Sequence, residues 1–283
     1  METGVKAGAG ADVLAFGEVL WDIIGGDAHI GGAPFNFAAH VVKCGFSAAI
    51  VSAVGDDDLG RRALDAVNGL QVDSALVRVH PSLPTGTVNV TLENGIPSYE
   101  ISMPVAWDEI GFPSVEAPSA PRALYFGTLA TRSEVSAAAL DAMLSSYPSA
   151  LTFFDVNLRQ KFWSVRSVKE RLAFADILKV NDEEMRTLGF SPDGLFAEFS
   201  RLKTLIETRG AEGCAVWARD GEAFTCPAVD DGPVVDTVGA GDSFSAAFLS
   251  AVLEGRTLAE AAHAGSVRAG KVAARAGAVP DGV

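Results

Sequence analysis

The sequence predicts an α/β protein with a mostly parallel β-sheet, and three observations lead to this prediction. Short apolar runs typical of strands alternate with helix-type runs, which is the order that parallel strands require. Two glycine-rich turns, at 31–36 and 236–242, each lead directly into a helical pattern. One stretch, 84–106, interrupts this order with alternating apolar and polar residues, which indicates an antiparallel hairpin.

The first part of the chain alternates strand and helix. Residues 12–20 have the composition of a buried strand, and Asp22 lies just past its carboxyl end. Pro34 stands where a helix begins, and Gly45 is a suitable C-cap for that helix. A strand over 47–54 and a further helix complete the pattern. This βαβα order favours neighbouring parallel strands.

Residues 84–106 are expected to form a β-hairpin lid inserted in a single domain that runs over 11–283. Strand patterns at 87–93 and 98–103 flank Asn94-Gly95, a strong signal for a tight hairpin turn. An ordinary edge hairpin explains the same residues equally well.

The strand–helix order resumes after the hairpin. Strands are expected at 123–129, 151–155, 176–180, 204–208, 214–218 and 222–226, and a helix at 133–146. Thr257 and Glu260 form a capping box for an alanine-rich C-terminal helix. The segment 265–271 nearly matches a Walker A loop, but it lies within that helix and lacks the hydroxyl that holds Mg²⁺. We therefore reject it as a nucleotide loop.

The composition excludes several classes of function. Lys+Arg 22 against Asp+Glu 36 gives a net charge of −14, which argues against nucleic acid or an anionic membrane surface as a partner. The three cysteines have no CxxC spacing and the four histidines form no ligand pattern, so reduced thiols are expected and no zinc site. No apolar run reaches membrane-spanning length, and the first ten residues lack a signal-peptide core. We expect a cytoplasmic protein.

The stretch 236–242 is the strongest candidate for a functional site. A helix start leaves backbone N–H groups unpaired, and these groups together with the helix dipole bind anions such as phosphate. Gly239 and Gly241 let the backbone come close to a ligand, because neither carries a Cβ. Asp242 then has two explanations: a general base for phosphoryl transfer, or a residue that caps the helix. For this loop alone, capping is the simpler explanation.

Taken together, the two glycine loops resemble those of the ribokinase-like (PfkB-type) family of carbohydrate kinases. The first motif is Gly31-Gly32-Ala33-Pro34-Phe35-Asn36-Phe37-Ala38, followed by Gly45 and Gly55, and the second is Asp236-Thr237-Val238-Gly239-Ala240-Gly241-Asp242. The resemblance covers the chain from Val13 to Pro280. It implies a ribokinase-like three-layer α/β/α fold with a small antiparallel β lid, to which the segment 21–31 contributes.

The resemblance implies a role for each matching residue. Asp242 is expected to be the catalytic base, and the anion hole for the migrating phosphoryl group is expected at Gly239, Ala240 and Gly241. Sugar-binding residues are expected at Asp22, Gly31, Gly32, Asn36, Asn157 and Arg159. The nucleotide is expected to lie along Asn181, Glu184, Thr208, Gly210, Gly213, Gly239, Gly241 and Ser266. Glu184 is expected to position Mg²⁺ through water, and Asp236 and Thr237 could hold K⁺. Helix capping explains Asn181 and Glu184 equally well.

The residues around the first glycine loop favour a neutral sugar. Residues 17–40 contain no Lys or Arg, whereas Glu18, Asp22 and Asp27 are acidic. A phosphorylated substrate would need a basic clamp, for which only Arg159 and Lys161 are candidates.

The segments 17–22, 84–86, 105–108 and 155–159 look like the fructokinase branch, although Val156 stands where Pro is commoner. The resemblance therefore implies transfer of the γ-phosphoryl group of ATP, with Mg²⁺, to fructose, giving fructose 6-phosphate. A ribokinase, a 2-keto-3-deoxygluconate kinase and a nucleoside kinase are alternatives within the family. A catalytically silent sugar- or nucleotide-binding relative is the alternative from another class. A homodimer paired through the lids is a further expectation.

Overall fold

The computed structural model describes residues 10–93, 96–112 and 120–283. Its large sheet consists of β1 (Val13–Phe16), β4 (Ala48–Gly55), β5 (Val77–His80), β8 (Ala123–Phe126), β9 (Leu151–Asp155), β10 (Ile177–Asn181), β11 (Thr204–Thr208), β12 (Cys214–Ala218) and β13 (Ala223–Cys226). The strand order is β13-β12-β11-β10-β9-β8-β1-β4-β5. From β11 to β5 every neighbouring pair is parallel, and β12 and β13 form an antiparallel edge. The predicted mostly parallel sheet is confirmed.

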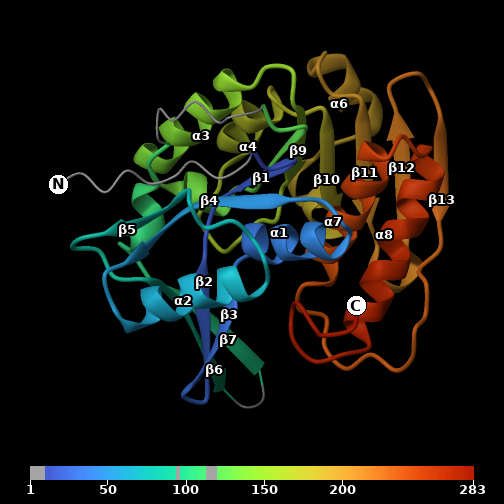
Figure 1. The fold of residues 1–283 in the computed structure, drawn as a ribbon. Coiled ribbons are helices and arrows are strands. Elements are labelled where there is room, and N and C mark those ends of the chain that lie inside the picture. Colours follow the sequence, from blue (N-terminus) through green and yellow to red (C-terminus); the bar gives the residue numbers. More distant parts are fainter. Residues whose placement is uncertain (1–9, 94–95, 113–119) are drawn as a thin grey trace.

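Helices cover both faces of the large sheet (Figure 1). They are α1 (Ala33–Lys43), α2 (Asp58–Gly69), α3 (Glu134–Ser146), α4 (Val165–Leu172), α5 (Asp182–Leu188), α6 (Pro192–Glu198), α7 (Ala240–Leu253) and α8 (Leu258–Ala273), with short 3-10 helices η1 (Ala106–Glu109), η2 (Leu129–Arg132) and η3 (Gly210–Glu212). Helices α1, α2, α7 and α8 share one apolar core with the sheet, and α3 to α6 share the other. The fold is therefore a three-layer α/β/α arrangement.

The buried strands explain why the sheet is covered on both sides. All eight residues of β4 are buried, as expected for a parallel strand with helices on each face. On the α1 and α7 side, Phe37 stacks on Tyr125 with ring centroids 3.7 Å apart, and Phe153 packs against Phe248. Aromatic packing of this kind fixes the distance between α1, the sheet and α7. It thereby fixes the frame of the candidate site.

A second, four-stranded sheet projects away from the large sheet (Figure 1). It consists of β2 (Leu20–Ile24), β3 (Asp27–Gly31), β6 (Gly86–Glu93) and β7 (Ile96–Ile101), in the order β3-β2-β6-β7. Its two hairpins are antiparallel, and the parallel pair β2–β6 joins them. The predicted small antiparallel lid is confirmed, with this parallel junction added. The predicted turn Asn94-Gly95 lies outside the described residues, and the division into a domain over 11–283 and a lid over 84–106 stays a prediction.

The prediction of one strand over 12–20 is wrong. The strand of the large sheet ends at Phe16, and Leu20 begins β2 of the small sheet. Gly17 has φ +147°, and a Cβ at this position would lie 2.5 Å from Pro34 Cγ. The backbone can turn here only because residue 17 is glycine. Asp22 therefore lies within the small sheet and not after a strand of the large one.

Other predictions agree closely with the structure. Strands β9 and β11 have the predicted bounds, and the Walker-like segment 265–271 lies within α8. The capping box of Thr257 and Glu260 is present. Helices α4 and α6 and strand β5 were not predicted, because each is short and carries many polar residues. In the described part of the chain, no helix is long and apolar enough to cross a membrane.

Candidate active site

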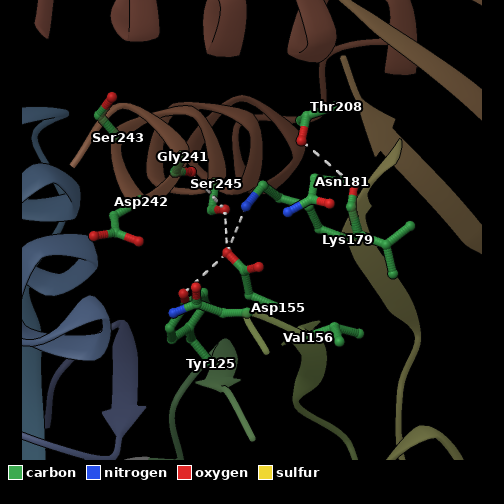
Figure 2. A network of polar contacts seen from close by, with 12 residues as sticks. Tyr125, Asp155, Val156, Lys179, Asn181, Thr208, Gly241, Asp242, Ser243 and Ser245 are labelled. Carbon is green, nitrogen blue, oxygen red and sulfur yellow. Dashed lines mark hydrogen bonds and ion pairs between the residues drawn. The ribbon is translucent and has the colours of Figure 1, made fainter. Parts of the chain in front are cut away.

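The polar residues of the two glycine loops meet at the start of α7. Figure 2 shows Asp242 and Gly241 at this helix end, above Asp155 and Lys179 from the strands β9 and β10. Asn36 reaches the same place from α1, and its Nδ2 donates to Asp242 Oδ2 at 2.9 Å. The hydrogen bond joins the two motifs through Asn36 and Asp242, which are 206 residues apart in the chain. Ligand sites of open α/β sheets lie at this edge, where parallel strands end.

The second glycine loop forms an anion-binding geometry. Gly239 is the N-cap of α7 with φ +77°, a left-handed conformation that favours glycine. The amides of Gly241 and Asp242 lie in the first turn, so the helix offers them no carbonyl partner. A Cβ on Gly239 would lie 2.5 Å from the carbonyl oxygen of Ala278. The C-terminal segment therefore packs directly against the loop and supports its shape.

Asp242 has the properties of a general base. Burial raises its pKa to about 6, and the nearby Asp155 acts in the same direction. The hydrogen bond from Asn36 opposes this rise, as do the positive charges of Lys179 and Arg159. The residue nevertheless keeps some exposed surface. A carboxylate with a pKa near 6 is ionised at neutral pH and still basic enough to take a proton.

Asn36 has an unused acceptor at the same place. Its Oδ1 is buried and has no hydrogen-bond partner within the described residues, whereas its Nδ2 is fixed by Asp242. Buried polar atoms normally have partners. The carbonyl oxygen therefore fits a hydroxyl donor of a ligand, placed beside the carboxylate of Asp242.

The other predicted sugar-binding residues come from the small sheet and from the loop after β9. Asp22 is half-buried on β2, and a Cβ on Gly31 would lie 2.7 Å from Asp22 Oδ2. A Cβ on Gly32 would lie 2.3 Å from the carbonyl oxygen of Glu18, so both glycines are needed for close packing. Burial raises the pKa of Asp22, and the charge of Arg159 opposes the rise. Asn157 begins the same loop in a left-handed conformation, with φ +44°.

Asn181 and Glu184 form a capping box at the start of α5. Glu184 N donates to Asn181 Oδ1 at 2.8 Å, and Glu184 Oε2 accepts from Asn181 N at 2.8 Å. Glu184 Oε1 accepts from Leu158 N at 2.7 Å. The capping explanation is therefore correct for the local structure. In addition, Glu184 ties the start of α5 to the loop that carries Asn157 and Arg159.

Three of the predicted nucleotide residues, Thr208, Gly210 and Gly213, lie at the end of β11 and in the turn that leads to β12. Thr208 Oγ1 donates to the carbonyl oxygen of Val180 at 3.4 Å. Gly210 and Gly213 both have positive φ, and a Cβ on Gly213 would lie 2.1 Å from the carbonyl oxygen of Cys226. Ser266 is buried on α8, with its hydroxyl oxygen 3.7 Å from the sulfur of Cys226. Its contact with the nucleotide stays a prediction from the resemblance.

Asp236 and Glu184, two of the predicted metal-binding residues, already have protein partners. Asp236 accepts from Val238 N at 2.9 Å and from Gly277 N at 3.1 Å, while Thr237 is exposed. No group of three or more His, Cys, Asp or Glu side chains suited to a metal occurs among the described residues. Glu184 fits a role in which it binds Mg²⁺ through water, because Mg²⁺ usually keeps several of its waters. Each Glu184 oxygen keeps a lone pair for such a water.

Sequence reasoning missed two features of the site. Glu18 is buried between β1 and β2, where burial raises its pKa to about 7. The second feature is the network around Asp155 Oδ2, which accepts from Lys179 Nζ at 2.7 Å, Tyr125 Oη at 3.1 Å and Ser245 Oγ at 3.0 Å (Figure 2). One signal was present in the sequence: a lysine inside the apolar strand Ile177–Asn181 needs a buried partner.

The fold and the comparisons with known proteins together define the class of protein. It is a phosphotransferase that acts on an alcohol group. The model of the pfkB family of carbohydrate kinases matches residues 16–281, so the chain belongs to that family.

Several named proteins are similar to this chain over most of its length. A putative sugar kinase of Pyrococcus horikoshii is 28% identical over 265 residues, which span 86% of this chain and 83% of that protein. Fructokinase-1 of Zea mays is 30% identical over 275 residues, with coverage of 86% and 83%. The crystal structure of a Vibrio cholerae fructokinase with fructose, ADP and calcium bound has a TM-score of 0.83, 22% identity and coverage of 96% and 95%. The Pyrococcus horikoshii protein, crystallised with ATP, has a TM-score of 0.83, 24% identity and coverage of 94% for both chains.

Proposed function

We propose that this carbohydrate kinase transfers the γ-phosphoryl group of ATP to a hydroxyl of a neutral sugar, and that the sugar is fructose, phosphorylated on its 6-hydroxyl. The observation that carries the proposal is the pairing of Asp242 with Asn36 at the start of α7. A base with a pKa near 6, an unpaired acceptor and unpaired helix amides lie together there. This set provides proton removal, hydroxyl binding and anion binding in one place.

The chemistry divides among these residues. Asn36 Oδ1 accepts a hydrogen bond from a sugar hydroxyl, and the Asp242 carboxylate takes the proton of the reacting hydroxyl. The sugar oxygen attacks the γ-phosphorus, and the bond between that phosphorus and the β–γ bridging oxygen breaks, so that ADP leaves with the bond's electron pair. The amides of Gly241 and Asp242 stabilise the charge of the migrating group. Mg²⁺, positioned through water beside Glu184, would neutralise charge on the phosphates.

Charge around the sugar residues supports a neutral substrate. The charge of Arg159 opposes the pKa rise of Glu18, Asp22 and Asp242, and the charge of Lys179 does so as well for Asp242. Three acidic residues and one exposed arginine do not make the basic clamp that a second phosphate would need. The relatives named fructokinase, and the neighbour solved with fructose, point to fructose among neutral sugars.

A substrate panel tests the proposal. ADP release from ATP is measured with fructose, ribose, 2-keto-3-deoxygluconate, a nucleoside and fructose 6-phosphate, in the wild type and in Asp242→Asn. We expect the highest kcat/KM with fructose, and a kcat about 10²–10⁴-fold lower in the variant. If another member of the panel gives a higher kcat/KM than fructose, that compound is the substrate and the proposal of fructose is wrong. Sugar and ATP binding without turnover would identify a catalytically silent relative.

A further inference from the structure

Lys179 lies in the apolar interior directly below the second glycine loop. Its neighbours on β10, Leu178 and Val180, are fully buried, and its own side chain is only 8% exposed. A buried ammonium group loses its hydration, so it persists only with a close partner of opposite charge. That partner is Asp155, whose Oδ2 lies 2.7 Å from Lys179 Nζ.

The carboxylate of Asp155 is itself held in one position. Besides Lys179, its Oδ2 accepts from Tyr125 Oη and Ser245 Oγ, as Figure 2 shows. Ser245 Oγ also lies 3.0 Å from the carbonyl oxygen of Gly241. The network therefore connects β8, β9, β10 and α7, and it holds the ammonium group at a defined distance from the loop.

The ammonium group lies next to Gly241 of the loop. A Cβ built on Gly241 would be 3.4 Å from Lys179 Nζ. The positive charge is thus close to the two unpaired amides of the first helical turn. It also acts on Asp242, because it lowers the pKa that burial and Asp155 raise.

We propose that Lys179 is a positioning residue for phosphoryl transfer, whose fixed positive charge lets the Asp242 carboxylate and the incoming phosphoryl group occupy the same helix end. The proposal rests on the proposed kinase function. Two negative groups repel each other strongly where water is largely excluded. The ammonium group offsets this repulsion from below the loop, where it does not obstruct either group.

The charges around Asp242 show why Lys179 is needed to offset the repulsion between the Asp242 carboxylate and the phosphoryl group. Asn36 on α1 is a neutral donor, whereas Asp155 on β9 and Glu18 after β1 are acidic neighbours. Arg159 is the other cation that acts on Asp242, but its side chain is exposed and belongs to the sugar side. Lys179 is therefore the buried cation on the loop side of the base.

Four variants test the proposal. Lys179→Met removes the charge, Lys179→Arg keeps it, and Lys169→Met removes an exposed, ion-paired lysine of α4 as a control. The double variant Asp155→Asn/Lys179→Met removes both buried charges, so that no unpaired carboxylate is left to destabilise the fold. Thermal unfolding, kcat, KM and the pH dependence of kcat/KM are measured for each.

We expect Lys179→Met to lower kcat by about 10²–10³-fold, as for loss of an electrostatic stabiliser of the transition state. Lys179→Arg should regain part of this loss. The acidic limb of the pH profile should move to higher pH in Lys179→Met, since the charge that favours the Asp242 carboxylate is gone while Asp155 remains. The double variant should recover the melting temperature but not kcat. Near wild-type kcat in the double variant would show that Lys179 only balances Asp155, and would overturn the proposal.

A binding measurement separates this proposal from the proposed function. The Kd for ATP is measured by calorimetry without any sugar. Loss of a buried cation near the phosphates should weaken ATP binding by about tenfold or more in Lys179→Met and in the double variant, and leave Lys169→Met unchanged. If the wild type phosphorylates no sugar, the proposed function fails. In that case the Kd for ATP still tests Lys179. If the double variant binds ATP as tightly as the wild type, the role of Lys179 is overturned as well.

Discussion

Replacing Asp242 with Asn removes the proton acceptor and preserves the shape of the site. Asn36 Nδ2 donates to Asp242 Oδ2 at 2.9 Å, and an Asn side chain offers an amide oxygen in the same place. The loop amides and the glycines are untouched. A positioned general base contributes about 10²–10⁴-fold in rate. We therefore expect kcat to fall by that factor, which corresponds to about 3–5 kcal/mol in the activation barrier.

The same substitution should stabilise the fold. The pKa of Asp242 rises from 3.8 to about 6 on folding, chiefly because burial disfavours the charged form. The destabilisation is absent below pH 3.8, grows as the pH rises to about 6, and is complete above that value. At about 1.4 kcal/mol per pKa unit the full effect is about 3 kcal/mol, and partial exposure of the carboxyl group reduces it to about 1–2 kcal/mol. Asn carries no charge, so this destabilisation disappears.

The assay combines coupled ADP release at pH 7.5 with thermal unfolding at pH 7.5 and pH 4.5. Asp65→Asn, which changes an exposed aspartate of α2, is the matched control. The expected result is an Asp242→Asn protein with kcat lowered about 10²–10⁴-fold that melts higher than the wild type at pH 7.5, with a smaller difference at pH 4.5. Near wild-type turnover would refute the reasoning, because a residue that only caps α7 is replaced well by Asn.

Three further predictions concern the loop, the base and the assembly. Gly239→Ala should abolish most activity and destabilise the fold by about 1–3 kcal/mol, because φ is +77° and the new Cβ meets Ala278. The control variant Gly277→Ala, at φ +85° with open space around it, should leave kcat unchanged. Equal kcat in the two variants would contradict the prediction. Asn36→Ala removes the hydrogen-bond donor that opposes the rise in the pKa of Asp242. The acidic limb of the pH profile of kcat/KM should therefore move above pH 6, and the KM for the sugar should rise. An unshifted acidic limb would argue against the hydrogen bond. Light scattering should give twice the 29.4 kDa chain mass if the lids pair, and a monomer at assay concentration would exclude that dimer.

The sequence predicts elements well where the local signal is strong. Strands β9 and β11 are short apolar runs bounded by polar residues, and Asn181 with Glu184 carries the spacing of a capping box. In each case the residues that decide the structure lie within a few positions of one another. The strand over 12–20 failed for the opposite reason. The apolar run continues across Gly17, and only the approach of Pro34 in three dimensions shows that the chain turns there.

Some parts of the site could likewise be predicted from the sequence, and others could not. The glycine loops and Asp242 are visible as motifs, because backbone geometry at a helix start demands particular residues in sequence. The contacts of Asp155 with Tyr125, Lys179 and Ser245 join residues 30, 24 and 90 positions away. Such a network depends on the order of the strands in the sheet, and local sequence patterns do not predict that order. A charge in an apolar strand shows that a partner exists, but not which residue it is.

The turn at Gly17 has a consequence for how substrate preference can change during evolution. Asp22 and Gly31 lie on β2 and β3, whose hydrogen-bonded neighbours in the small sheet are one another and β6. Asp242, Lys179 and Asp155 belong to the large sheet and its helix α7. In the proposed function, where Asp22 and Gly31 bind the sugar, substitutions in the small sheet can therefore change which sugar is bound while the reacting groups keep their positions. One framework for phosphate chemistry can in this way serve a family of many acceptors, with new specificities arising from a few strands.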